Sequence, residues 1–179
     1  MKNYQKVLLI ITVPAFLCGC STFYRCFKKE NYNVNKVGTI MVFPFKNLSS
    51  HPNGGEIVTA NFITELRTAT TFPVKTPLIA SDNDVESETP FLTLEKKLEY
   101  AKSQNSVTLI TGLVTEFKYK KGLGEDPVVG FTCEMTDVQT GEVIWQSSIS
   151  VTSGFFNFGD FSLNKYCQKA AKVMVNTIK

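Results

Sequence analysis

Residues 106–150 read SVTLITGLVTEFKYKKGLGEDPVVGFTCEMTDVQTGEVIWQSSIS, and this stretch decides the fold of the chain. It holds runs rich in β-branched and aromatic residues at 107–119, 128–138 and 142–150, the last continuing to Thr152. Such runs, bounded by turn residues, are typical of strands. Gln139-Thr140-Gly141 lies between the second and third runs, which predicts a β-hairpin there. We therefore predict a long strand followed by a hairpin.

The alternation of residue types predicts which face of each strand is buried. In the strand at 107–119 the odd positions, from Val107 to Tyr119, are predicted to form one apolar face. In the hairpin one face is apolar, while Thr132, Glu134 and Ser148 belong to the opposite, small and polar face. We expect a sheet with one side on the core and one polar side. The predicted core side of the hairpin consists of Val129, Phe131, Cys133, Met135, Val143, Trp145, Ile149 and Val151.

The rest of the chain predicts helices that pack on this sheet. Val37–Phe45 is a short apolar run typical of a strand buried on both faces, and a short strand is expected at 74–79. Apolar residues at helical spacing predict helices from the Asn53–Glu56 region to about Thr70, at 93–104 and at 162–178, with an acidic loop at 80–90. The fold class is therefore α/β, a single mixed sheet in the order β-α-β-α-β-β-β-α.

The start of the first long helix carries the sequence Asn53-Gly54-Gly55-Glu56. Asn53 followed three residues later by Glu56 predicts an N-cap with its reciprocal partner. The alternative is that the two glycines present backbone N–H groups to an anion. Because the segment lacks the lysine and the second spaced glycine of a P-loop, we favour a simple helix start.

The N-terminus resembles a bacterial lipoprotein signal. Lys2 and Lys6 precede an apolar run at 7–17 that is too short for a membrane span of roughly 20 residues. Leu17-Cys18-Gly19-Cys20 resembles a lipobox, which implies that Cys20 becomes the first mature residue and carries fatty acyl chains such as palmitate. Ser21, rather than an aspartate, favours the outer membrane. The alternatives are a plain secretory signal and an N-terminal anchor helix.

This interpretation divides the chain into a signal peptide at 1–19, a lipidated tether at 20–36 and one periplasmic domain at 37–179. The tether is assigned because residues 21–36 are polar, rich in Asn and Lys, and without period. The 19 basic and 16 acidic residues give the whole chain +3, of which Lys2 and Lys6 account for two, so the mature chain has +1. A charge this small gives no support to nucleic-acid binding.

With Cys20 acylated, the mature chain keeps three thiols, at Cys26, Cys133 and Cys167. An odd number does not indicate a disulfide framework. Cys133 and Cys167 each fall on the apolar face of a predicted element, so we interpret them as small core side chains. A bridge between these two in an oxidising periplasm stays open as the alternative.

The sequence shows no constellation of catalytic residues. The single histidine, His51, follows Ser49 and Ser50, but no third group is marked to orient its ring, as a triad requires. No spacing of His, Cys or acidic residues is typical of a metal site. We therefore expect no cofactor, no metal and no enzymatic activity, and we expect a binding or assembly module.

One segment is unusual for a connection between a strand and a helix. Residues 153–161 read SGFFNFGDF and contain four phenylalanines between polar neighbours. Three interpretations remain open: a local satellite core, a subunit interface, or insertion into a membrane surface. The candidate interface residues are Phe155, Phe156, Phe158 and Phe161.

Together, VGTIMVFPFKNLSS at 37–50, the Gly-Gly helix start, and the stretch at 106–150 resemble the CsgG/PelC-like family of outer-membrane lipoproteins. The resemblance covers residues 37–178 and is nearest to the PelC branch, which serves export of the Pel polysaccharide. Its most specific part is the hairpin motif Asp137-x-x-Thr140-Gly141-Glu142-x-x-Trp145. The long pore-forming hairpins of CsgG have no counterpart here, since both hairpin arms belong to the sheet.

The resemblance implies a lipid-anchored subunit on the periplasmic face of the outer membrane. It also implies a homo-oligomeric ring that serves an envelope machine for polysaccharide or protein export, with outer-membrane lipid and an export component as partners. The alternative is a regulatory lipoprotein that binds and activates a periplasmic enzyme such as a cell-wall synthase, because related folds occur in such activators.

Overall fold

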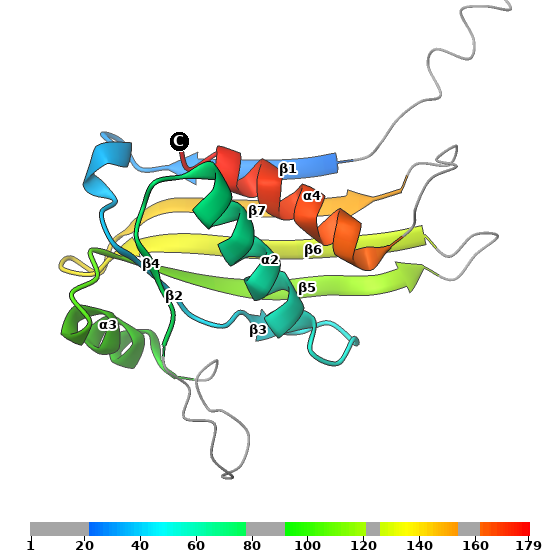
Figure 1. Ribbon diagram of the computed structural model, residues 1–179, viewed down its shortest axis with the longest axis horizontal. Helices are drawn as coiled ribbons and strands as arrows, with labels where there is room; N and C mark the ends of the chain where they lie inside the picture. Colours follow the sequence, from blue (N-terminus) through cyan, green and yellow to red (C-terminus); the bar gives the residue numbers. More distant parts are fainter. Residues whose placement is uncertain (1–21, 78–91, 121–125, 154–161) are drawn as a thin grey trace, which may run out of the picture.

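The computed structural model describes residues 22–77, 92–120, 126–153 and 162–179 (Figure 1). These residues form one mixed sheet with helices packed on it, which confirms the predicted α/β class. None of the helices in this part has the length and apolar character that crossing a bilayer requires. The elements in chain order are β1 (Thr22–Lys28), the 3-10 helix η1 (Val34–Lys36), β2 (Ile40–Val42), β3 (Lys46–Asn47), α2 (Gly54–Ala69), β4 (Val74–Lys75), α3 (Leu94–Ser103), β5 (Thr108–Lys120), β6 (Asp126–Asp137), β7 (Val143–Thr152) and α4 (Leu163–Asn176).

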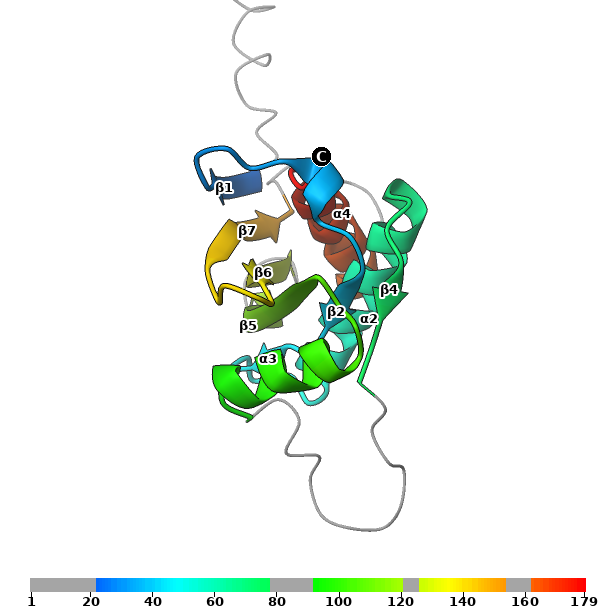
Figure 2. The same ribbon diagram turned by 90° about the vertical axis from the view of Figure 1, so that its left-hand side faces the viewer.

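The sheet has the order β1-β7-β6-β5-β2-β4, with β3 paired to β5. The pairs β1–β7, β7–β6 and β6–β5 are antiparallel, whereas β2 and β3 pair in parallel with β5, and β4 pairs in parallel with β2. The parallel pairs arise because α2 and α3 are crossover connections, which parallel strands require. Figure 2 shows α2 and α4 together on one side of the sheet, with α3 at the end where β5 starts.

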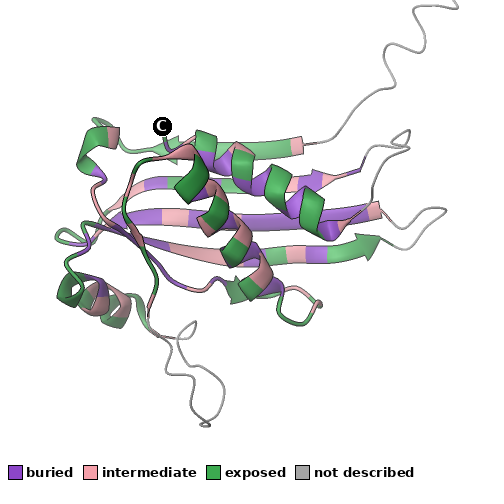
Figure 3. Cartoon of the chain, in the orientation of Figure 1, coloured by how far each residue is buried: buried purple, intermediate pink, exposed green. Residues whose placement is uncertain are grey.

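The main core lies between the sheet and the helix pair α2/α4. Trp145, Phe62 and Met174 are fully buried there, one each from β7, α2 and α4. The predicted stripe of α4 is buried along its whole length, as the purple inner face of the helix in Figure 3 shows. A second, smaller core under α3 contains Met41, Phe43, Ala101, Leu109 and Val138.

The predicted apolar face of the strand at 107–119 is wrong because β5 contains a bulge. The register with β6 shifts between Val114 and Glu116, so Thr115 is an extra residue. One inserted residue moves every later side chain to the other face. The core side of β5 therefore carries even positions such as Ile110 and Val114 first, and then the odd position Phe117.

A second bulge corrects the face assigned to Val143. The register of β6 with β7 shifts between Met135 and Thr136, and Val143 lies opposite Thr136. Ile144 rather than Val143 packs against the main core. Trp145, which pairs with Met135, is fully buried as predicted.

The predicted N-cap of α2 is correct in position, because Asn53 immediately precedes the helix, but the predicted capping interaction does not form. Asn53 has a left-handed backbone, with φ of 60°, and its side chain makes no capping hydrogen bond. The two glycines that follow are needed for close packing, since a Cβ at Gly55 would lie 2.4 Å from the Phe45 carbonyl oxygen. Thr59 stabilises the same contact, because its Oγ1 accepts from the Phe45 N–H and donates to the Gly55 carbonyl. The segment around Phe45 therefore packs directly against the start of α2.

The structure differs most from the sequence prediction at the tether. Residues 22–28 form the edge strand β1, paired to β7 over its full length from Thr22 opposite Val151 to Lys28 opposite Trp145. The connection that follows is held to the domain by η1 and by Tyr32, whose hydroxyl donates to the Ile178 carbonyl at 2.6 Å. Residues 22–36 therefore belong to the folded domain.

The hairpin motif has a structural explanation. The Asp137 carboxylate accepts from the backbone N–H groups of Gln139 and Thr140, and Gly141 supplies the positive φ of 72° that the turn needs. Glu142 forms an ion pair with Lys29 of the β1 connection. The motif thus builds the turn and fixes it to the N-terminal segment.

Cys133 and Cys167 are buried free thiols in the described part of the chain, and Cys26 is an exposed one. The interpretation of Cys133 and Cys167 as core side chains is confirmed, since both are fully buried in the main core.

Candidate interaction surface

One face of the sheet is covered by α2 and α4, and the other is covered only at its β2/β5 end, where α3 packs on Met41, Phe43 and Leu109. The part of this second face that lies beyond α3 is called the bare face, since none of the described helices covers it. In Figure 2 the side of β1 and β7 that points away from α4 has no helix over it. The side chains of this bare face form rows across the strands because paired residues share a face. The rows are Phe23-Ser150-Gly130-Glu116, Arg25-Ser148-Thr132-Leu113 and Phe27-Gln146-Glu134-Thr111.

Hydrogen bonds between side chains link neighbouring polar residues within these rows. The Thr132 hydroxyl donates to Ser148 Oγ at 3.0 Å, and the Ser150 hydroxyl donates to Glu116 Oε2 at 3.3 Å. Groups that bond one another in this way on an exposed sheet remain accessible to water and to a partner. The middle of the bare face is therefore polar, and its apolar side chains are concentrated at the β1 edge.

The edge strand β1 carries a concentration of exposed aromatic side chains. Phe23, Tyr24 and Phe27 are 63%, 52% and 51% exposed. The Arg25 guanidinium lies 5.7 Å from the centre of the Phe23 ring. Lys29 N–H donates to the Ile144 carbonyl, so by alternation the backbone groups of the even residues of β1 point away from β7. An edge with exposed aromatic rings and with backbone groups that point away from the sheet is typical of an interaction surface.

The start of β1, the end of β5 and the start of β6 all lie at the same end of the sheet. Thr22 pairs with Val151, Val151 with Val129, and Val129 with Phe117, so the start of β1 is level with Phe117. Lys118, Tyr119 and Lys120 continue beyond that level and are exposed.

The residues that the sequence predicts for lipidation and for an interface all lie outside the described part of the chain. Cys20 is two residues before the first described residue, Thr22. Phe155, Phe156, Phe158 and Phe161 also lie outside it. Their described neighbours, Ser153 after β7 and Ser162 before α4, belong to the end of the sheet that contains Thr22, because Thr152 pairs with Val128 near the start of β6.

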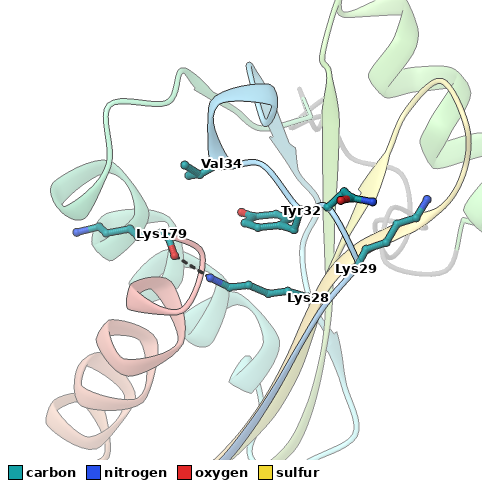
Figure 4. A pocket seen from close by; sticks show the side chains of 6 residues that line it. Lys28, Lys29, Tyr32, Val34 and Lys179 are labelled. Carbon is teal, nitrogen blue, oxygen red and sulfur yellow. Dashed lines mark hydrogen bonds between the residues drawn. The ribbon is translucent and has the colours of Figure 1, made fainter.

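A pocket of about 400 Å³ lies where the β1 connection meets the end of α4 (Figure 4). The Lys28 ammonium donates to the Lys179 carbonyl at 2.7 Å and lies 5.2 Å from the centre of the Tyr32 ring. Burial raises the pKa of Tyr32 to about 12, which keeps its hydroxyl a donor to Ile178. These contacts join the β1 connection to the end of α4, so we interpret the residues of this pocket as structural.

The described residues also contain no group of His, Cys, Asp or Glu suited to hold a metal ion. The His51 ring packs edge-on against Phe117, with ring centres 5.0 Å apart, and its Nδ1 lies 2.6 Å from the Pro52 carbonyl. Ser49 Oγ donates to Asn47 Oδ1 instead of to the ring. The histidine therefore has a local packing role.

Sequence reasoning missed β1, which carries most of this surface. The segment TFYRCFK does contain residues that favour strands, such as Phe, Tyr and Thr. It shows no alternation of apolar and polar residues, because an edge strand exposed on both sides has no buried face that would require an apolar residue at every second position.

No family model matches the chain, and no curated protein is significantly similar to it. Solved structures do share its fold. A PelC dodecamer from Paraburkholderia phytofirmans superposes with a TM-score of 0.69 at 22% identity, over 88% of this chain and 97% of that one. Lipoprotein GNA1162 from Neisseria meningitidis gives 0.57 at 18% identity, over 79% and 97% of the two chains. The hypothetical protein CT253 from Chlamydia trachomatis gives 0.55 at 11% identity, over 79% and 95%.

These similarities confirm, at the level of the fold, the resemblance to PelC that the sequence motifs indicate. The shared region takes in nearly the whole of each solved chain, so the likeness extends over the complete domain.

Proposed function

We propose that the chain is a lipid-anchored, ring-forming scaffold on the periplasmic face of the outer membrane. In this role it belongs to an envelope machine for polysaccharide or protein export. Its own contribution is structural, without catalysis, and Cys20 carries the lipid. The observation that carries the proposal is the fold shared over 88% of this chain with PelC, a protein whose solved structure is a dodecamer.

The β1 edge supports self-association independently of the comparison. Three exposed aromatic side chains on one strand supply apolar surface, and burying that surface favours association. The backbone groups of the even residues of β1, which point away from β7, add hydrogen-bonding capacity along the same line. In a ring, each subunit meets its neighbour through such a lateral surface.

The mass of the assembled protein tests the proposal. The processed, lipidated protein is purified in detergent, and its mass is measured by light scattering after correction for detergent. We expect a mass many times that of one chain, which is 20.0 kDa before processing. A mass of one chain over the accessible concentration range would contradict the ring.

A variant pair locates the interface. Tyr24→Ser combined with Phe27→Ser removes two exposed rings from β1, whereas Leu94→Ser removes an exposed apolar side chain from α3. We expect the first variant to lose assembly with an unchanged melting temperature, and the second to assemble normally. The Phe155→Ser, Phe156→Ser, Phe158→Ser variant tests separately the interface that the sequence suggests.

A further inference from the structure

We propose that β1 is a releasable strand. It detaches from β7 as a unit, whereas the connection that follows it stays fixed to the domain. In the detached state residues 22–28 become part of the link between the domain and the N-terminal segment. The use of this added length rests on the proposed lipid at Cys20, but the release itself does not.

The first reason is that β1 buries very little surface. Thr22 is half-buried, and the six residues after it are exposed. Its rings at Phe23, Tyr24 and Phe27 are already more than half exposed in the paired state. Within the described part of the chain, neither hydrophobic core includes a residue of β1. Because burial of apolar surface is the main force that keeps an element in place, β1 gives up little of it on leaving the sheet.

The second reason is that β1 is held along one edge only. The Lys29 N–H donates to the Ile144 carbonyl, so by alternation the odd residues of β1 direct their backbone groups to β7. Ser147 adds a hydrogen bond from its hydroxyl to the Arg25 carbonyl at 3.0 Å. A central strand such as β6 is paired on both edges and lies over the main core. The pairing of β1 can therefore open while β6 stays in place.

Some of the side-chain contacts of β1 lie within the strand itself. The Arg25 guanidinium lies over the Phe23 ring, and Cys26 Sγ donates to the Phe27 carbonyl. Contacts of this kind remain when the strand leaves the sheet. They therefore do not oppose its release.

The contacts change in kind at Lys28. Its ammonium donates to the Lys179 carbonyl at 2.7 Å, as Figure 4 shows. The next residue, Lys29, forms an ion pair with Glu142 at the turn between β6 and β7. Tyr32 packs half-buried against the main core. The chain is thus fixed to the domain from Lys28 onward, and Lys28 is the hinge of the release.

Release changes the distance that the domain can keep from the N-terminal segment. In the paired state the seven residues of β1 lie along β7. When they extend away from Lys28, they supply about 23–25 Å of chain, at about 3.3–3.6 Å per residue. A subunit anchored at Cys20 then has two standing distances, a short one with β1 paired and a long one with β1 released, and its core is intact in both.

Hydrogen exchange of backbone amides tests the release. The processed, lipidated protein is studied in detergent, and the amides of Phe23, Arg25 and Phe27 are compared with those of β6. We expect the β1 amides to exchange at least about tenfold faster, because a local opening is easier than global unfolding. Dilute urea should leave the β1 rates nearly unchanged and raise those of β6, since the opening of β1 exposes little surface. Subunit contacts at β1 would slow its exchange as concentration rises, so the rates are taken at the limit of dilution.

A disulfide lock provides the matched comparison. Cys26 lies directly opposite Ser147. This pair is not hydrogen-bonded, so its Cα atoms approach to about 4.5 Å, within the range that a disulfide spans. We combine Ser147→Cys with Cys133→Ala, because Cys133 is the neighbour of Ser147 on β6. After oxidation with copper phenanthroline the three β1 amides should exchange at least about tenfold more slowly, whereas the same variant, once reduced, should exchange as the parent does.

The two standing distances are measured on the same variant. The lipidated protein is bound to a supported phosphatidylethanolamine–phosphatidylglycerol bilayer, and neutron reflectometry gives the thickness of the protein layer. We expect the layer of reduced protein to extend further from the bilayer than that of oxidised protein, by up to about 25 Å. Thermal melts of Cys133→Ala alone and of the reduced double variant confirm that both fold.

Three results would overturn the proposal in whole or in part. Equal exchange of the β1 and β6 amides, or rates that rise together in urea, would show that β1 opens only with the whole domain. Oxidised and reduced layers of equal thickness would refute the two distances. Protein that does not bind the bilayer refutes the lipid at Cys20 and these distances with it, whereas the exchange rates decide the release independently. The mass measurement that tests the ring is separate from all three.

Discussion

The two faces of the sheet are built from the same strands and differ in what lies over them. On β6, Phe131, Cys133 and Met135 are at most 1% exposed beneath α2 and α4, whereas Thr132 and Glu134 between them are partly open to solvent. Figure 3 shows this change from residue to residue along the strand. The covered face therefore supplies stability, and the bare face with its β1 edge is free to serve contacts.

Truncation of the largest side chain on the covered face should have the largest effect. Trp145→Ala removes a fully buried indole and the hydrogen bond from Nε1 to Thr177 Oγ1 at 3.1 Å. We expect a loss of about 3–5 kcal/mol in the free energy of unfolding. Chemical denaturation measures it, with Trp145→Phe as the milder control. A change below about 1 kcal/mol would mean that the helices do not cover this face as described.

A pair of glycines compares the two faces by the same substitution. A Cβ at Gly112, on the covered side of β5, would lie 2.6 Å from the Phe45 ring, so Gly112→Ala should cost about 1–3 kcal/mol. A Cβ at Gly130, on the bare side of β6, would meet the movable Glu116 side chain at 3.2 Å. Gly130→Ala should stay within about 0.5 kcal/mol. Equal thermal shifts for the two variants would remove the distinction between the faces.

The buried and exposed thiols are expected to differ in reactivity, and this difference depends on pH. Burial raises the pKa of Cys167 to about 12 and raises the pKa of Cys133 well above its ordinary value, with a smaller contribution from the Glu134 carboxylate. Both thiols should resist labelling at pH about 8, where exposed Cys26 reacts, since the thiolate is the reactive form.

The raised thiol pKa values also predict how stability depends on pH. Unfolding returns the pKa of Cys133 and Cys167 to about 9, so their contribution is fully present below that pH and is lost as the pH rises toward 12. Denaturant midpoints at a series of pH values, compared with a Cys167→Ala variant, measure this loss. Rapid native labelling of all three thiols would contradict the burial.

The smallest effect is expected in the middle of the bare face. Ser148 is exposed and accepts from Thr132 on the neighbouring strand. Ser148→Val keeps a strand-favouring residue there, so the free energy of unfolding should change by no more than about 0.5 kcal/mol. A thermal melt measures it. A destabilisation comparable to that of Gly112→Ala would show that this face is covered in the folded chain.

The sequence was a reliable guide where burial enforces a period. Cys167, Ala170 and Met174 of α4 are all buried as their spacing predicts. It was unreliable where backbone geometry intervenes, because the bulge at Thr115 reverses the faces of β5 without a marker in the residue pattern. The left-handed backbone of Asn53, whose side chain makes no capping hydrogen bond, is likewise not marked in the local capping pattern.

The interaction surface was predictable only in part. The polar side of the hairpin, with Thr132, Glu134 and Ser148, follows from alternation. The strand β1 does not, since Phe23, Tyr24 and Arg25 on an exposed edge have no periodic signal, and pairing with β7 is a long-range contact. The predicted lipid site and the phenylalanine-rich connection stay predictions.

The pairing of β1 with β7 also implies an order of events during folding. Arg25 and Ser147, joined by a hydrogen bond in the finished sheet, are 122 residues apart in the chain. Bringing residues this far apart together requires closing a long loop, which costs more conformational entropy than pairing neighbouring segments. The meander β5-β6-β7 assembles from neighbouring segments, and closing the long loop to β1 comes afterwards. The first strand to be made is thus the last to join the sheet, and until then its aromatic residues require protection from aggregation.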